Sequence, residues 1–290
     1  MRFSRTTLAL RKRSFRWPHH GFTLVELLVV IAIIGMMIGM MFPAVSAMRE
    51  AAHRATCQSR LARLGIALQK YEAGHGALPP GTTEPKGPIH NVPQGIHLSW
   101  TVRLLPYLDE AGTFKQIDLA AGAYAEKNAA VRSLRIAAFA CPSQRSALQR
   151  ATPASSYAGC HHDVEAPIAE DNHGVLFLNS RISERDVTDG VEHTFYLGEK
   201  RTGTDDLGWM SGTRATLRNT GTPLGQTDEE KPPSDLFVGG FGACHPAGAN
   251  FLLGDGAVRL ISLAIDQGVY QQLAHRADGK LLASGPTREE

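Results

Sequence analysis

The longest apolar stretch of the chain lies close to its first residue. Residues 22–42 are apolar except for Thr23, Glu26 and two glycines, and six arginine and lysine residues come before them without any acidic residue. A helix of this length rises about 30 Å, which matches the hydrocarbon core of a bilayer. The pattern therefore predicts a transmembrane helix over residues 22–42. The basic N-terminus is expected in the cytoplasm and the rest of the chain on the other side of the membrane.

After Pro43 the apolar positions recur with the period of a helix. One stripe has spacings of four, three, four and three residues: Cys57, Leu61, Leu64, Leu68 and Tyr71. Such a stripe is typical of an amphipathic helix with one face against a globular domain. We therefore expect one long helix from about Phe22 to about Tyr71, with residues 43–78 as its amphipathic continuation. Pro43 is expected to kink or locally melt this helix.

The pattern changes after residue 78 to short apolar runs between turn residues. Residues 99–117 predict one or two short helices interrupted by Pro106, because proline cannot donate the backbone hydrogen bond that a helix interior needs. Four later runs predict strands: residues 174–180, 194–200, 236–242 and 250–262. The sequence thus predicts an α+β fold, in which a long N-terminal helix packs on a mostly antiparallel β-sheet domain. This extracytoplasmic domain covers residues 79–290.

Composition and charge argue against several functions. The chain has 290 residues, is 43% hydrophobic and carries a formal net charge of +2, which is ordinary for a globular protein and gives no basic surface for nucleic acid. Neither the Gly-x-Ser-x-Gly nucleophile motif nor the His-Glu-x-x-His zinc motif occurs. We therefore expect no enzymatic activity, no cofactor and no nucleic-acid partner.

Glu26 is the one ionisable residue of the predicted transmembrane helix. A carboxylate in hydrocarbon costs about 2.5–3.5 kcal/mol on insertion scales, so it needs a partner. Two interpretations of the N-terminus leave Glu26 without a role. One is a secretory signal peptide with residues 45–47 as its cleavage site, but its apolar region should be only about 7–15 residues long. The other is an uncleaved signal anchor.

A third interpretation starts from Gly-Phe-Thr-Leu-Val-Glu at residues 21–26. A basic leader ending in Gly21, then Phe22 and a nearby carboxylate ahead of an uninterrupted apolar run, resembles the N-terminus of type IV prepilins and type II secretion pseudopilins. The resemblance implies that residues 1–21 are a leader, that a prepilin peptidase cuts after Gly21, and that Phe22 is then N-methylated. The new amino group of Phe22 is expected to pair with Glu26 of a neighbouring subunit and to set the register of assembly.

A second motif lies near the C-terminus, where His245 is followed after nine residues by Asp255 and Gly256. The motif is similar to the closing motif of a large family of prepilin-like proteins whose C-terminal domain has no assigned activity. The similarity covers most of the chain and implies an architecture rather than a reaction. Asp255 and Gly256 are expected to form a hairpin turn with positive φ, and His245 to anchor a loop through hydrogen bonds.

Four cysteines lie on the side of the membrane where disulfides persist: Cys57, Cys141, Cys160 and Cys244. Their spacing is not that of a zinc site. Because Cys141 and Cys160 flank a short segment, we expect them to form a disulfide. Cys57 and Cys244 are the candidates for a second one.

A polar cluster follows Cys160, with His161, His162 and Asp163 in succession. Adjacent residues of a strand point to opposite faces, so His161 and His162 are poorly placed to share one metal ion. We therefore expect a solvated loop and no metal site, with His161, His162 and Asp163 as weak candidate ligands.

Two functions remain open. The leading hypothesis is a prepilin-like structural protein of the cytoplasmic membrane, a subunit of a pilus, a pseudopilus or a type II secretion-like assembly. Its implied partners are a prepilin peptidase, other pilin-like subunits and the lipid of the cytoplasmic membrane. The alternative is a membrane-tethered extracytoplasmic binding domain or hydrolase that uses a prepilin-type export signal. The first predicts assembly that depends on Glu26, and the second predicts a monomer with a ligand pocket.

Overall fold

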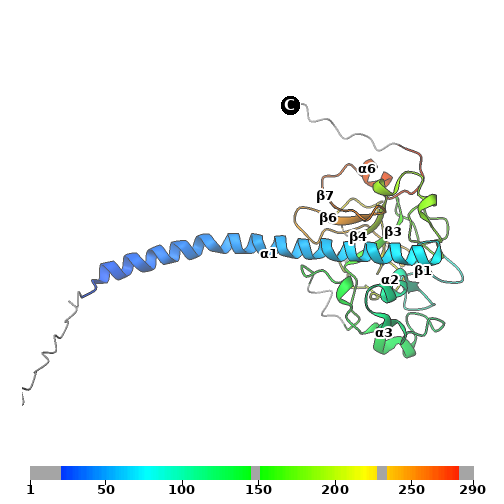
Figure 1. Cartoon of the computed structure of the whole chain (residues 1–290), viewed down its shortest axis with the longest axis horizontal. Helices are drawn as coiled ribbons and strands as arrows, with labels where there is room; N and C mark the ends of the chain where they lie inside the picture. The colour runs from blue at the N-terminus through cyan, green and yellow to red at the C-terminus, as the bar shows by residue number, and fades with distance from the viewer. Residues whose placement is uncertain (1–20, 145–150, 227–233, 281–290) are drawn as a thin grey trace, which may run out of the picture. The chain divides into compact units, whose positions relative to one another are not determined.

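The computed structural model describes residues 21–144, 151–226 and 234–280. Apart from Gly21, the predicted leader lies outside these residues. The chain divides into two compact units, residues 1–48 and residues 49–290, and the first helix begins in one and ends in the other (Figure 1). The sheet, the short helices and the C-terminal motif all belong to the second unit.

The first element is α1, Leu24–His75, which confirms the prediction of one long helix. Within the first unit its large apolar side chains are exposed. Among the described residues, α1 is the one helix long and apolar enough to cross a membrane. The helix continues through Pro43, so the expected local melting is wrong. A proline removes a single backbone hydrogen bond, and the other bonds of a long helix maintain it.

In the second unit, the end of α1 buries its predicted apolar stripe. Four members of the stripe are at most 1% exposed: Cys57, Leu61, Leu64 and Leu68. Tyr71 is partly buried against the same core. The helix ends at His75 and is followed by Gly76, whose φ of 74° is left-handed and whose N–H donates to the carbonyl of Glu72 at 2.7 Å. Glycine suits this position because it adopts positive φ without a steric penalty.

The second unit is built on a five-stranded sheet in the order β5-β3-β4-β6-β7. Figure 1 labels four of its strands, β3, β4, β6 and β7. Its strands are β3 (Tyr157–His162), β4 (Phe195–Glu199), β5 (Leu217–Asn219), β6 (Ala249–Leu253) and β7 (Val258–Ile261). β3 is antiparallel to β4 and parallel to β5, and β6 is antiparallel to both β4 and β7. A separate antiparallel pair consists of β1 (Thr82–Thr83) and β2 (Leu98–Ser99). The predicted α+β fold with a mostly antiparallel sheet is confirmed.

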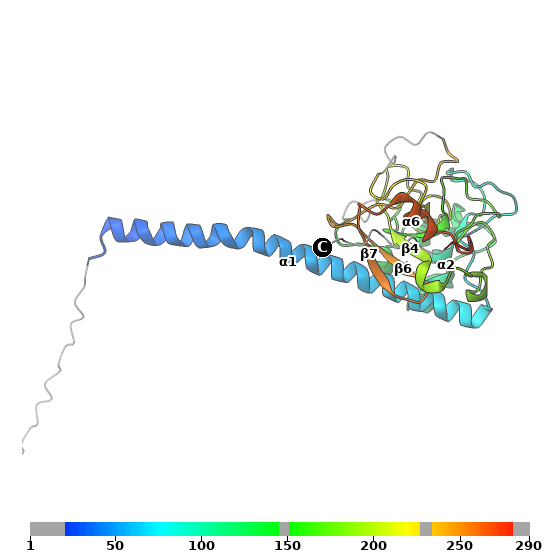
Figure 2. The same ribbon diagram turned by 90° about the horizontal axis from the view of Figure 1, so that it is seen from above.

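Each face of the sheet is covered by a different apolar core. On the α1 face the core includes Leu61, Leu64, Leu68, Tyr157, Leu197 and Leu252. On the other face, α6 (Gln267–Gln272) contributes Tyr270 to a core with Phe195 and Phe251. Figure 2 shows the sheet between α1 and α6. Phe195 and Leu197 reach different cores although they are two residues apart, because the β4–β6 register shifts between them.

The remaining helices within the described residues are short. They are α2 (Trp100–Leu104), η1 (Leu105–Tyr107), α3 (Ala111–Phe114), η2 (Glu126–Asn128), α4 (Ala129–Arg132), η3 (Ala137–Phe139), η4 (Glu184–Asp186) and η5 (Val191–His193), where η marks a 3₁₀ helix. The predicted interruption at Pro106 is confirmed, because α2 ends at Leu104 and Pro106 lies in η1.

Two of the four predicted strand regions are confirmed and two are wrong. Residues 194–200 contain β4, and residues 250–262 contain most of the β6–β7 hairpin. Residues 174–180 and 236–242 form only isolated bridges. The prediction also missed β3 and β5. The sequence of β3 is Tyr-Ala-Gly-Cys-His-His, which lacks the β-branched residues that are typical of strands. It forms a strand because it pairs with β5 on one side and with β4 on the other.

Candidate functional site

The predicted processing site lies at the start of α1. Gly21 and Phe22 precede the helix and are exposed. The N–H and the hydroxyl of Thr23 each donate to Oε2 of Glu26 at 2.8 Å, and the hydroxyl accepts from the N–H of Glu26 at 3.2 Å. This reciprocal arrangement is a capping box. The Gly21–Phe22 peptide bond therefore lies outside the helix, beyond its cap.

Glu26 thus has a partner within its own chain. Sequence reasoning looked for that partner only in the amino group of Phe22 and missed Thr23. The pattern Thr-x-x-Glu at residues 23–26 would have identified it, because this spacing is typical of a capping box. The amino group of Phe22 exists only after cleavage, so its pairing with Glu26 of another subunit stays a prediction.

In the second unit, the motif histidine lies between two carboxylates. Nδ1 of His245 is 2.6 Å from Oε1 of Glu50 in α1, and Nε2 is 3.4 Å from Oε1 of Glu199 in β4. The side chains of His245 and Glu199 are buried, whereas that of Glu50 is 39% exposed. Glu199 also accepts hydrogen bonds from the backbone and side-chain nitrogens of Asn250 at 2.8 and 3.0 Å. His245 therefore joins α1 to the sheet.

Two opposing effects act on the pKa of His245. Burial alone would lower it, because a charged ring loses hydration. The hydrogen bonds to Glu199 and Glu50 favour the charged ring and outweigh burial, so the pKa of His245 lies above its ordinary value. Both ring nitrogens are engaged by carboxylates, which is the geometry of the predicted hydrogen-bonded anchor rather than of a catalytic base.

A disulfide lies beside His245. It joins Cys57 of α1 to Cys141, 84 residues later, and Sγ of Cys141 is 4.0 Å from Nε2 of His245. The predicted Cys141–Cys160 disulfide is wrong, because Cys160 is a free thiol in the core on the other face of the sheet. The suggested Cys57–Cys244 pair is wrong as well, since Cys57 is bonded to Cys141. Disulfide partners need Cα atoms about 4.4–6.8 Å apart, and this depends on tertiary packing rather than on spacing in sequence.

Asp255 and Gly256 lie at the opposite end of β6 from His245. Oδ1 of Asp255 accepts from the N–H of Ala257 at 2.8 Å, and Gly256, with φ of 86°, donates its N–H to the carbonyl of Leu253 at 3.0 Å. The predicted hairpin turn is confirmed. A strand of this length extends roughly 17 Å, so the two parts of the motif fix β6 at its two ends and do not form one site.

The predicted solvated loop at His161 is wrong. His161 and His162 are the last two residues of β3, and both are buried. Nδ1 of His161 lies 3.1 Å from Oδ1 of Asn172, and burial lowers the pKa of His161 to about 3. His162 contacts Asp163 instead, the residue that follows the strand.

The carboxylate of Asp163 contacts two histidine rings. Its Oδ1 lies 2.5 Å from Nδ1 of His162 and 2.9 Å from Nδ1 of His173. Burial would raise the pKa of Asp163, but the hydrogen bonds of these rings and of its own backbone hold the pKa well below its ordinary value. A third ring, that of His275, lies tilted by 43° against His173, with their centroids 4.5 Å apart. The structure therefore adds His173 to the predicted cluster. The sequence did not show this residue as a member, because it reaches Asp163 only where the chain turns back to β3.

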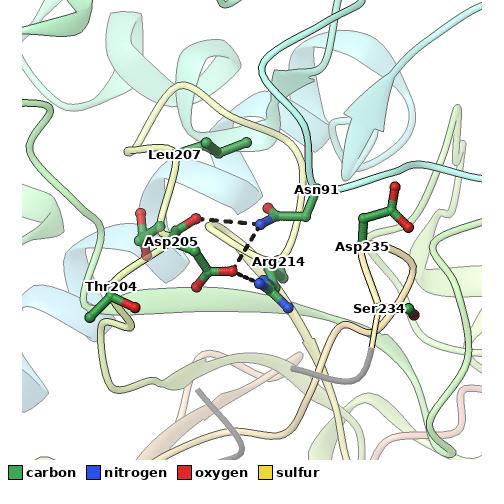
Figure 3. A pocket seen from close by; sticks show the side chains of 8 residues that line it. Asn91, Thr204, Asp205, Leu207, Arg214, Ser234 and Asp235 are labelled. Carbon is green, nitrogen blue, oxygen red and sulfur yellow. Dashed lines mark hydrogen bonds and ion pairs between the residues drawn. The ribbon is translucent and has the colours of Figure 1, made fainter. Parts of the chain in front are cut away.

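A polar hollow of about 570 Å³ lies elsewhere in the second unit (Figure 3). It is lined by Asn91, Thr204, Asp205, Asp206, Leu207, Arg214, Ser234 and Asp235. Asp205 forms an ion pair with Arg214 and accepts a hydrogen bond from Nδ2 of Asn91 at 3.2 Å. Figure 3 shows these three side chains turned toward one another on one side of the hollow, with Ser234 and Asp235 on the other.

The other two acids of the hollow are also paired. Oδ2 of Asp206 is 2.5 Å from Nζ of Lys200, and both side chains are buried. Oδ2 of Asp235 is 2.9 Å from Nδ1 of His90. Each carboxylate thus has a basic partner in the same unit.

Two family comparisons cover most of the chain. Residues 46–268 match the family described as "Protein of unknown function (DUF1559)", and residues 18–42 match the one described as "Prokaryotic N-terminal methylation motif". No curated protein and no solved structure matches the chain. The methylation motif implies processing by a prepilin peptidase, and together with the apolar start of α1 it is consistent with a membrane anchor.

Proposed function

The chain belongs to the family of proteins of unknown function DUF1559, and from this premise and its methylation motif we propose that it is a prepilin-like structural protein of an envelope assembly. It is cleaved after Gly21, N-methylated on Phe22 and held in the cytoplasmic membrane by residues 22–42. Its partners are a prepilin peptidase, other pilin-like subunits of a pseudopilus or type II secretion-like complex, and membrane lipid. The proposal includes no catalytic activity.

The observation that carries this proposal is the position of the methylation motif relative to α1. The motif covers residues 18–42, and the helix begins at Leu24, three residues after the expected cleavage site. The capping box of Thr23 and Glu26 keeps the scissile peptide outside the helix. The apolar surface that follows is exposed along α1, which suits first lipid and then neighbouring helices.

The disulfide supports an extracytoplasmic place for the second unit. Disulfides persist in oxidising compartments and are rare in the cytoplasm. Cys57 and Cys141 both come after the apolar segment, and six basic residues without any acidic one come before it. Both features agree with a cytoplasmic N-terminus and a C-terminal domain on the other side of the membrane.

The first prediction concerns processing. Mass spectrometry of the N-terminal peptide, from protein isolated from its native membrane, is expected to find a chain that starts at N-methylated Phe22. A Gly21→Val variant is expected to keep its leader, because the peptidase requires the glycine before the cleaved bond. A wild-type chain that starts at Met48 would instead identify an ordinary secreted protein and contradict the proposal.

The second prediction concerns Glu26. A Glu26→Ala variant is expected to insert into the membrane normally and to lose most of its co-purification with other pilin-like subunits after cross-linking in the membrane. The reason is that the amino group of Phe22 in the neighbouring subunit loses its carboxylate partner in a medium of low dielectric constant.

A Glu26→Gln variant separates this pairing from helix capping. Glutamine still accepts a hydrogen bond from the N–H of Thr23, as the capping box requires, but it carries no charge. If charge pairing drives assembly, Glu26→Gln and Glu26→Ala fail to the same extent. Normal assembly of Glu26→Ala would rule out the mechanism.

The polar hollow is the observation that favours the alternative, a tethered binding domain. Its lining groups already pair with one another, so it supports ligand binding less directly than the methylation motif supports assembly. This second function would be favoured if the protein is a monomer that binds a small polar ligand, and if Glu26→Ala changes neither its oligomeric state nor its ligand binding.

A further inference from the structure

Three side chains that commonly bind metals meet at the end of β3. His162, Asp163 and His173 each offer one donor atom, and these atoms lie within 4.8 Å of one another. His162 is the last residue of β3 and Asp163 follows it, while His173 belongs to the turn that leads the chain back to the strand. The cluster lies outside the predicted processing site and outside the contacts of His245.

The turn that carries His173 is held in place from two sides. Gly174 approaches β3 so closely that a Cβ at this position would lie 2.4 Å from the carbonyl oxygen of Cys160, so only glycine fits. From the other side, Nη1 of Arg276 donates to the carbonyls of Asn172 and Gly174 at 2.6 and 2.9 Å. The backbone on both sides of His173 is therefore fixed, and the ring is presented to Asp163 by the fold.

The donor set is that of a transition-metal site. Two imidazole nitrogens and one carboxylate oxygen are the protein ligands of many zinc and non-haem iron sites, which keep further positions open to water. The His162 side chain is 9% exposed, that of Asp163 is 19% exposed and that of His173 is 47% exposed. An ion held by them would thus be anchored on the buried side and open to water on the side of His173.

The donor atoms lie somewhat closer together than they would around such an ion. Two ligands at about 2.0–2.1 Å from a tetrahedral metal lie about 3.3 Å apart. Nδ1 of His173 and Oδ1 of Asp163 are separated by 2.9 Å, and Nδ1 of His162 and the same oxygen by 2.5 Å. Both contacts would therefore lengthen by less than about 1 Å on binding.

The contact of His162 with Asp163 joins two atoms that can both bind a metal. Nδ1 of His162 lies 2.5 Å from Oδ1 of Asp163. When Nδ1 carries no proton, both atoms offer a lone pair, and a cation between them would accept both lone pairs. The metal ion would thus take the place of the proton in this contact.

The described residues contain a second group of potential metal ligands, but its donor atoms are already engaged by other groups. It consists of Cys57, Cys141, Glu199 and His245. The two sulfur atoms are bonded to each other, and only a thiolate binds a metal strongly. The ring of His245 is already shared by two carboxylates.

We propose that His162, Asp163 and His173 bind one divalent transition-metal ion of the Zn²⁺ type. The ion joins the end of β3 to the turn before Val175 and stabilises that edge of the domain. This replaces the sequence-based expectation of a metal-free loop, with His173 in the place of His161. The site does not depend on whether the chain assembles with pilin-like subunits.

The test uses the full chain in detergent, purified without a polyhistidine tag, stripped with a chelator and kept oxidised. Titration with Co²⁺, followed by its visible absorption and by competition with Zn²⁺, is expected to give one equivalent bound. Zn²⁺ should also raise the midpoint of thermal unfolding, because it binds the folded state. His173→Ala and Asp163→Asn are expected to weaken binding at least ~10-fold, since even loss of an indirect partner costs a metal site that much.

The matched control is His193→Ala. His193 is 46% exposed beside Glu192, so it resembles His173 in exposure and in having a carboxylate neighbour. Its variant should bind Co²⁺ as the wild type does, and circular dichroism should confirm that all variants are folded. Absence of stoichiometric binding, equal affinity in His173→Ala, or a sulfur-to-cobalt charge-transfer band would each overturn the proposal.

Discussion

Loss of the Cys57–Cys141 disulfide is expected to lower the free energy of unfolding of the second unit by about 4–5 kcal/mol in the chain-entropy model. The bond closes a long loop, since its partners are 84 residues apart, and it attaches α1 directly to the domain that the helix packs on. An open loop gives the unfolded chain many more conformations. The effect is a large fraction of the stability of a typical domain.

The measurement is urea unfolding of the full chain in detergent, with and without a reducing agent, followed by tryptophan fluorescence. Trp100 and Trp209 are buried in the second unit and report its unfolding. The double variant Cys57→Ser/Cys141→Ser should match the reduced wild type, while Cys244→Ser, which leaves this disulfide intact, should change stability by less than about 1 kcal/mol. Equal stability of the oxidised and reduced wild type would contradict this assignment, as would peptide mapping that finds Cys141 bonded to Cys160.

Replacement of His245 by alanine is expected to cost about 3 kcal/mol. The change leaves Glu199 buried without its cationic partner, and breaking a buried ion pair from one side is strongly destabilising. The value lies at the low end of the usual range because Asn250 still donates two hydrogen bonds to Glu199. Glu50 adds little to the cost, since its side chain is partly exposed to water.

The pH dependence of this effect has a definite sign. The pKa of His245 is raised by Glu199 and Glu50, so its contribution is fully present below the unfolded-state pKa of about 6.5 and is lost as pH rises through the folded-state pKa. The difference in unfolding free energy between wild type and His245→Gln should therefore be largest near pH 6 and shrink as pH rises. Burial lowers the pKa of His97, His161 and His275, so their contributions to stability change with pH in the direction opposite to that of His245. Because wild type and His245→Gln share these three residues, their contributions cancel in the difference.

His193→Gln is the control for this series. Its ring is half exposed beside Glu192, so its replacement should change the free energy of unfolding by less than about 1 kcal/mol. A difference between wild type and His245→Gln that grows as pH rises would mean that His245 is neutral in the folded state. That result would contradict the anchoring role derived from its two carboxylate contacts.

The sequence alone determined the parts of this protein that depend on neighbouring residues. The apolar stretch over residues 22–42 and the stripe from Cys57 to Tyr71 predicted α1, because helical periodicity is a local property. Asp255 and Gly256 predicted the β6–β7 hairpin, because a tight turn is specified by the few residues within it. The prepilin-like motif was recognisable for the same reason, since its residues are consecutive.

Only the tertiary structure decided which distant residues meet. Glu50 and His245 are 195 residues apart in sequence, and their contact depends on how α1 docks on the sheet. The same docking brings Cys57 to Cys141, whereas sequence spacing favoured Cys160. His173 reaches Asp163 only because the chain turns back on β3. Such contacts follow from packing and strand register over the whole domain, which no short stretch of sequence encodes.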